Sequence, residues 1–211
     1  MEQYYRERAP EYDQIYQIAR RQDELNQLRA WLTERVRGRT VLEIAAGTGY
    51  WTEAAASVAK AITATDCNPE LLEIAARRPL GPHVTLRSAD AYMLPHFSDA
   101  FDAGMAMLWW SHVEKQRCRE FLSHFTSRLG PASSVLMIDQ IYVEAFSSPI
   151  SKQDEWGNLY TLRNLANGAT YEIIKNYPSD EELQEAFTGA CEDICVVRTS
   201  EFWALSAQVR S

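Results

Sequence analysis

The chain has 211 residues, of which 46% are hydrophobic and 24% are charged, and its formal net charge is −8. This length predicts one domain with a substantial core, and the acidic balance disfavours nucleic-acid partners, which are bound through clusters of Lys and Arg. No apolar stretch approaches the roughly 20 residues that cross a bilayer, and the polar start lacks an export signal, so we expect a cytoplasmic protein with no membrane partner.

The first third of the chain predicts a helical lid followed by alternating strands and helices. Residues 1–20 are polar and rich in tyrosine, and an amphipathic helix over 21–36 stops at Gly38, so we expect residues 1–38 to form an N-terminal lid and helices. Strands are expected over 40–45 and 61–66, with a helix over 50–58 between them. Asn68 as N-cap and Pro69 at the first helical position open the next helix, which runs to about residue 78.

The same alternation continues to residue 139. Strands are expected over 84–86, 101–107 and 134–139, and an amphipathic helix over 114–129 stops at Gly130 and Pro131. Strands that alternate with helices imply a mostly parallel sheet with helices on both faces.

After residue 139 the pattern changes. Residues 158–164 and 170–176 predict an antiparallel hairpin across Asn167 and Gly168, within an insertion over 155–178. Ser179 and Glu182 form a capping box for a helix, and two closing strands follow over 194–198 and 202–207. We therefore expect a single domain over residues 1–211: a three-layer α/β sandwich with a doubly wound seven-stranded sheet, an added β-hairpin and an N-terminal helical lid.

The turn after the first strand is the main functional motif. Residues 43–49, Glu-Ile-Ala-Ala-Gly-Thr-Gly, join a strand to a helix, a layout whose backbone N–H groups hold polar ligands. In a dinucleotide binder the spacing is G-x-G-x-x-G, but Thr52 takes the third glycine position here. Glu43 is also poorly suited to a neighbouring phosphate pair. A carboxylate at this strand end better suits a cationic ligand.

This turn resembles the first motif of class I S-adenosylmethionine-dependent methyltransferases, with Ala45 in place of the usual first glycine. Asp66 ends the second strand, where an acid meets a ribose hydroxyl, although a turn Asp that caps the next helix is the alternative. Asp90 and Ala91 match where this family binds the adenine amino group, and Met107 lies where it lines the methionine part of the cofactor. Over residues 40–140 the resemblance implies a Rossmann-like methyltransferase fold with S-adenosylmethionine as cofactor.

Aromatic side chains complete the expected cofactor site, because aromatic faces attract a sulfonium cation. Packing in the core or in the lid is the alternative for each of them. The expected cofactor-binding residues are Tyr4, Glu43, Ala45, Gly47, Gly49, Trp51, Asp66, Cys67, Asp90, Ala91, Met107 and Trp110.

His112, Tyr5 and Tyr12 are the candidate catalytic residues. Histidine has an unperturbed pKa of about 6.5, which suits proton removal at neutral pH, and packing beside the following helix is the alternative for His112. The four cysteines form no C-x-x-C pair, and no His lies at metal-ligand spacing from Cys or carboxylates, so we expect reduced thiols and no metal site.

The resemblance implies methyl transfer to an N, O or C atom of a small molecule by in-line displacement, with catalysis mostly by positioning. The acceptor should be small, because only the N-terminal segment and one hairpin are left to build its pocket. The hairpin could instead be a dimer contact, so both a monomer and a homodimer are open.

Three alternatives also stay open. Sulfonium activates all three attached carbons, so the cofactor's own amine could displace methylthioadenosine, as in azetidine-2-carboxylate synthases. A non-catalytic cofactor-binding module is the second alternative. A nicotinamide-dependent dehydrogenase is the third, and Thr52 and Glu43 disfavour it.

Overall fold

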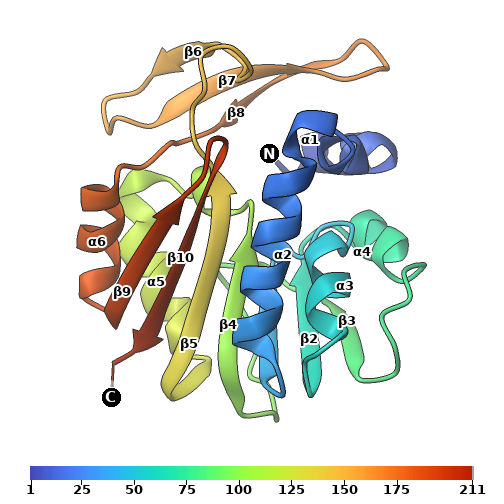
Figure 1. The fold of residues 1–211 in the computed structure, drawn as a ribbon. Helices are drawn as coiled ribbons and strands as arrows, with labels where there is room; N and C mark the ends of the chain where they lie inside the picture. Colours follow the sequence, from blue (N-terminus) through green and yellow to red (C-terminus); the bar gives the residue numbers. More distant parts are fainter. Residues whose placement is uncertain (211) are drawn as a thin grey trace.

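The computed structural model describes residues 1–210 and centres on a seven-stranded sheet of order β3-β2-β1-β4-β5-β10-β9 (Figure 1). Strands β1 to β5 run parallel to one another, whereas β10 is antiparallel to both β5 and β9. This is the expected Rossmann-like methyltransferase fold. The strands are β1 (Thr40–Ile44), β2 (Ala61–Asp66), β3 (Val84–Ser88), β4 (Phe101–Met107), β5 (Leu129–Gln140), β9 (Cys191–Arg198) and β10 (Phe202–Val209).

Helices cover both faces of this sheet, because successive residues of the strands point to opposite sides. On β5, Val135 and Met137 pack on one face, and Leu136 and Ile138 pack on the other. The first face carries α5 (Cys118–Thr126) and α6 (Asp180–Thr188), and the second carries α2 (Gln22–Val36) and α3 (Tyr50–Ala56). Helix α4 (Pro69–Ala75) connects β2 to β3.

Two parts lie over the same end of the main sheet (Figure 1). The lid segment, residues 1–21, consists of α1 (Glu2–Arg8) and the 3₁₀ helices η1 (Ala9–Tyr16) and η2 (Ala19–Arg21). The second sheet is antiparallel and consists of β6 (Ile150–Gln153), β7 (Leu159–Asn164) and β8 (Thr170–Ile174). Helix α2 is a core helix rather than part of the lid, because four of its side chains are buried against the main sheet.

The structure corrects three sequence expectations. The hairpin gains a third strand, β6, which was missed because all four of its residues are exposed and show no alternation. The helix expected from residue 114 begins at Cys118, because Lys115 donates its N–H to Asn158 Oδ1 at 2.8 Å and starts the 3₁₀ turn η4 (Lys115–Arg117). β5 begins at Leu129, five residues before the expected start. Within residues 1–210, no helix combines the length and apolarity that crossing a bilayer requires.

Candidate functional site

The turn between β1 and α3 is held by glycines and by the buried Asp66. Gly47 and Gly49 have φ of 59° and 78°, the left-handed region that glycine tolerates. A Cβ on Gly49 would lie 2.9 Å from the Ala75 Cβ, so α4 also excludes a side chain there. Asp66 Oδ2 accepts from Gly47 N at 2.9 Å, and its Oδ1 accepts from Asn68 N at 2.8 Å. The carboxylate therefore joins the ends of β1 and β2.

Glu43 lies beneath this turn rather than beside a ligand. It is 1% exposed, and its Oε2 accepts a hydrogen bond of 2.6 Å from the Thr52 hydroxyl. Burial raises the pKa of Glu43 to about 8. Thr52, the residue that breaks the dinucleotide spacing, is thus the partner of a buried carboxyl group that supports the turn from below.

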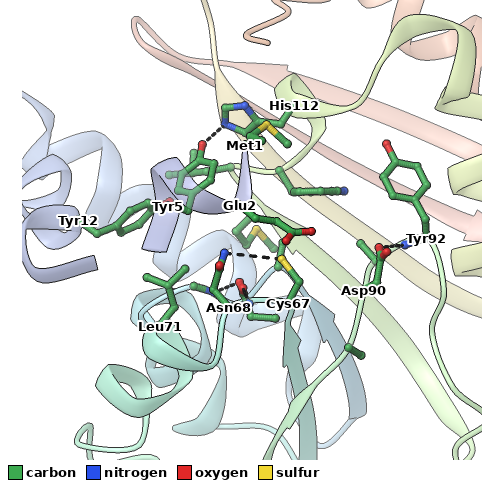
Figure 2. Close-up of a pocket in the computed structure, with 18 of the residues that line it drawn as sticks. Met1, Glu2, Tyr5, Tyr12, Cys67, Asn68, Leu71, Asp90, Tyr92 and His112 are labelled. Carbon is green, nitrogen blue, oxygen red and sulfur yellow. Dashed lines mark hydrogen bonds between the residues drawn. The ribbon is translucent and has the colours of Figure 1, made fainter. Parts of the chain in front are cut away.

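The larger of two adjoining cavities has a volume of about 460 Å³ and opens at the carboxyl ends of β1, β2 and β4, beneath the lid segment. In Figure 2, Tyr5 and Tyr12 of the lid segment lie on one side of it, and Asp90 and Tyr92 lie opposite. Ten of the expected site residues line this cavity. They are Tyr5, Tyr12, Ala45, Gly47, Asp66, Cys67, Asp90, Ala91, Met107 and His112.

Five expected site residues lie elsewhere, because neighbouring side chains on a helix or turn point in different directions. Tyr4 packs against Leu165, which follows β7, and against Ile173 of β8. Trp51 is buried in the core beside α2, and Trp110 is buried on the opposite face of the main sheet. Glu43 and Gly49 support the turn without lining the cavity.

Trp109, rather than Trp110, lines the larger cavity together with Asn68, Leu108 and Tyr92. The sequence placed both tryptophans after β4 but gave no signal for which of them faces the ligand side. That choice depends on the 3₁₀ turn η3 (Trp110–His112).

The half-buried Tyr5 and the buried His112 form a pair that closes the top of the larger cavity. Tyr5 Oη lies 2.6 Å from His112 Nε2 (Figure 2). His112 Nδ1 lies 2.6 Å from the carbonyl oxygen of Ile174. Because a carbonyl oxygen only accepts, Nδ1 carries the proton and Nε2 accepts from the Tyr5 hydroxyl.

The protonation of His112 differs from the sequence expectation. Burial, with a further contribution from Lys175, lowers its pKa to about 3 rather than leaving it near neutrality. Burial also raises the pKa of Tyr5 well above its usual value. Both side chains are therefore neutral near pH 7, and neither is poised to remove a proton.

A second cavity of about 190 Å³ lies between the lid segment and the second sheet. It shares Tyr5, Tyr12, Leu108 and His112 with the larger cavity. Leu108 adopts a φ of 57°, an uncommon conformation for a non-glycine residue that marks a constrained backbone at this shared wall.

Ion pairs and aromatic stacking fasten the lid segment to the glycine turn. Arg78 pairs with Asp13 of η1, and its Nε donates to the Thr48 carbonyl oxygen at 2.6 Å. The Tyr16 and Tyr50 rings stack with centroids 3.7 Å apart. The position of η1 is therefore coupled to the loop that forms the floor of the larger cavity.

Comparisons with known proteins agree with this geometry. Residues 41–132 match the family model described as a methyltransferase domain, and none of the curated proteins matches the sequence. The solved structure of DhpI with SAH has 28% sequence identity and a TM-score of 0.78, and the match covers 99% of this chain and 94% of that chain. These matches are consistent with a class I S-adenosylmethionine-dependent methyltransferase, the family that the turn motif resembles.

Two further solved structures share this fold. The DhpI–SAM–HEP complex has 29% identity and a TM-score of 0.76, with coverage of 97% of this chain and 94% of that chain. The N-methyltransferase NodS from Bradyrhizobium japonicum WM9 has 14% identity and a TM-score of 0.61, with coverage of 92% and 99%, and shows the fold alone.

The larger cavity suits S-adenosylmethionine, the cofactor in the DhpI–SAM–HEP structure. The volume of this cavity lies within the range of about 300–1,000 Å³ that is typical of small-molecule sites. It lies beyond the carboxyl ends of parallel strands, where such folds bind ligands. Two tyrosine rings, Tyr5 and Tyr12, provide the aromatic faces that suit a sulfonium cation. Among residues 1–210, no three His, Cys, Asp or Glu side chains are grouped to hold a metal.

Proposed function

We propose that this protein transfers the methyl group of S-adenosylmethionine to a small molecule held in the second cavity. One observation supports this most directly: the two cavities meet at a common wall formed by Tyr5, Tyr12, Leu108 and His112. In-line displacement needs a nucleophile on the side of the methyl group opposite the sulfur, and adjoining cavities allow that approach.

Within this proposal, residues at the strand ends hold the cofactor, which supplies an electrophilic methyl group when it is bound. Asp66 would accept from the ribose hydroxyls, and Asp90 would accept from the adenine amino group. Ala45, Gly47 and Met107 lie where the methionine part would bind, with Tyr5 and Tyr12 beside the sulfonium.

Tyr5 and His112 shape the reaction site rather than exchange protons with the acceptor. His112 donates to the Ile174 carbonyl oxygen and accepts from Tyr5, so it fixes the Tyr5 hydroxyl at the common wall. The lid segment that carries Tyr5 covers the site and keeps out water, which strengthens the electrostatic interactions inside it.

The second cavity also favours transfer to another molecule over cyclisation of the cofactor, because an intramolecular reaction needs no room for a second reactant. A dehydrogenase would bind a nicotinamide dinucleotide in place of S-adenosylmethionine, so this proposal does not include that activity. All four cysteines lie in the described part of the chain as free thiols, which suits the cytoplasmic location that we include in this proposal.

Product analysis tests this function. The protein is incubated with S-adenosylmethionine alone and with panels of small acids, amines and alcohols, and products are separated by liquid chromatography and mass spectrometry. We expect S-adenosylhomocysteine only when an acceptor is present. Methylthioadenosine formed without any acceptor would establish cyclisation instead, and tight cofactor binding without turnover on any panel would establish a non-catalytic module.

A further inference from the structure

The walls of the second cavity carry an excess of positive charge. Arg8 of α1, Arg163 of β7 and Lys175 after β8 all line it, and no Asp or Glu of residues 1–210 does. Arg20 and Arg21 also line this cavity, but both form salt bridges with Glu201.

Two of the three remaining cations have no carboxylate partner among the described residues. Arg8 Nη1 donates to the Tyr4 hydroxyl at 2.8 Å, and its guanidinium lies 5.1 Å from the Tyr12 ring centroid. Arg163 donates through Nη1 to the Ser148 hydroxyl, and its buried Nε has no hydrogen-bond partner. A buried donor without a partner costs free energy, so a ligand that accepts from Arg163 would be stabilising.

Lys175 is held beside them by a single carboxylate. Its Nζ donates to Ser111 Oγ at 2.7 Å and to Asp139 Oδ1 at 3.1 Å, which leaves the third ammonium hydrogen available. Burial lowers the pKa of Lys175, Asp139 opposes that shift, and the nearby Arg163 and Arg8 lower it further. Three cations thus share one cavity and one carboxylate, an arrangement that an anion would neutralise.

The histidine and the carboxylate nearest to this cavity are not suited to deprotonate a neutral acceptor. His112 accepts from Tyr5 and is neutral, and Asp139 is engaged with Lys175. An acceptor that already carries a negative oxygen needs no such base.

We infer that the second cavity binds the oxyanion of a small acid, a carboxylate or a phosphoryl-type group, and that one oxygen of this anion receives the methyl group. This inference rests on the proposed function and names the substrate class of that site. A carbon–oxygen bond forms as the carbon–sulfur bond breaks, the electron pair of that bond passes to sulfur, and the products are a methyl ester and S-adenosylhomocysteine. No proton leaves the acceptor.

The two halves of this anion site come from different parts of the chain. Arg8 belongs to the lid segment, whereas Arg163 and Lys175 belong to the second-sheet region. Without an anion these cations repel one another, and with an anion they are drawn together. Binding of the acid therefore holds the lid segment against the second sheet and closes the reaction site.

Variants of Arg163 test the inference in the intact protein. The panel contains small carboxylates and small phosphonates or phosphate monoesters as separate arms, with amines and alcohols as neutral comparators. Arg163→Gln removes the charge, Arg163→Lys keeps it, and Arg119→Gln changes an exposed arginine of α5 as the matched control. Circular dichroism and thermal unfolding establish that each variant is folded, and calorimetry gives its affinity for S-adenosylmethionine.

We expect one arm of acids to yield methyl esters and the amines and alcohols to yield no product. Arg163→Gln should raise KM for the acid about 10- to 100-fold, the equivalent of one hydrogen bond to a charged group, with partial rescue by Arg163→Lys. Arg119→Gln should match the unaltered protein, and cofactor affinity should change less than about twofold in every variant.

Two results would overturn the inference while leaving methyl transfer intact. One is methylation of amines or alcohols with no acid accepted. The other is loss of cofactor affinity in Arg163→Gln with an unchanged KM for the acid, which would assign these cations to the cofactor's own carboxylate. Methylthioadenosine formed without an acceptor would refute the proposed function itself.

Discussion

His112 is buried between the main sheet and the second sheet, where its imidazole stays neutral at pH values that would protonate a free histidine. Its pKa is about 6.5 in the unfolded chain and about 3 in the folded protein. As pH falls below about 6.5, the unfolded chain binds a proton that the folded protein does not. Stability is therefore lost progressively between about pH 6.5 and pH 3.

This residue predicts a defined pH dependence of stability. Replacement of His112 by Asn removes the titration and keeps a donor for the Ile174 carbonyl oxygen. Urea unfolding at about pH 7 and pH 5 should show that the unaltered protein loses about 2 kcal/mol more than His112→Asn over this interval. Parallel losses in the two proteins would contradict the buried, neutral state of His112.

Ala45 predicts a stabilising substitution. It adopts a φ of 51° at the position where the family's motif has glycine, and this left-handed conformation costs an L-residue about 1–2 kcal/mol. Part of that gain is offset by the freer unfolded chain, so Ala45→Gly should raise the melting temperature by about 1–4 °C. Ala54→Gly, in the interior of α3, is the control and should lower it. Equal losses in both variants would show that Ala45 is unstrained.

For single residues, the sequence predicted the cavity-lining positions at strand ends better than those on the lid segment and the turns. Asp66, Asp90 and Met107 line the larger cavity, because the carboxyl ends of parallel strands meet at one edge of the sheet. Tyr4 and Trp110 do not line it, because each adjoins another aromatic residue and the direction of a side chain on a short helix depends on tertiary packing.

Among the elements, η1 is tied to the glycine turn by Arg78, which contacts Asp13, Thr48 and Glu53. Arg78→Gln should loosen the lid segment and weaken cofactor binding by about two- to fivefold, the range for a partly exposed ion pair. Calorimetry measures the affinity, and hydrogen exchange over residues 1–16 should become faster. Arg77→Gln, an exposed neighbour, is the control and should change neither quantity. Unchanged exchange in Arg78→Gln would contradict this coupling.

The elements of the main sheet could be predicted because their side chains alternate between its two faces. β6 could not, because its four residues are all exposed and its position depends on pairing with β7. The start of α5 depends on the hydrogen bond from Lys115 to Asn158, 43 residues away in the chain, which no local pattern encodes. Arg163 was visible in the predicted hairpin, but its position above the second cavity follows from how the second sheet sits over the lid segment.

In the whole molecule, the buried pair of Asp139 and Lys175 joins the end of β5 to the second sheet. Replacing Asp139 by Asn leaves the Lys175 ammonium without its carboxylate, which should cost about 3–5 kcal/mol of unfolding free energy. Lys152→Gln breaks an ion pair within the second sheet whose lysine is half exposed, and should cost less than about 1 kcal/mol. Similar losses in urea unfolding would show that the buried pair does not fasten the two sheets.

The structure as a whole contains two adjoining cavities that share four lining residues, and cations line the second cavity. The most direct test supplies S-adenosylmethionine that is deuterated in its methyl group, together with small carboxylic and phosphonic acids, and follows the label by mass spectrometry. We predict a deuterated methyl ester and S-adenosylhomocysteine in equal amounts. Label that stays in methylthioadenosine, or that appears only on nitrogen or carbon, would contradict the account.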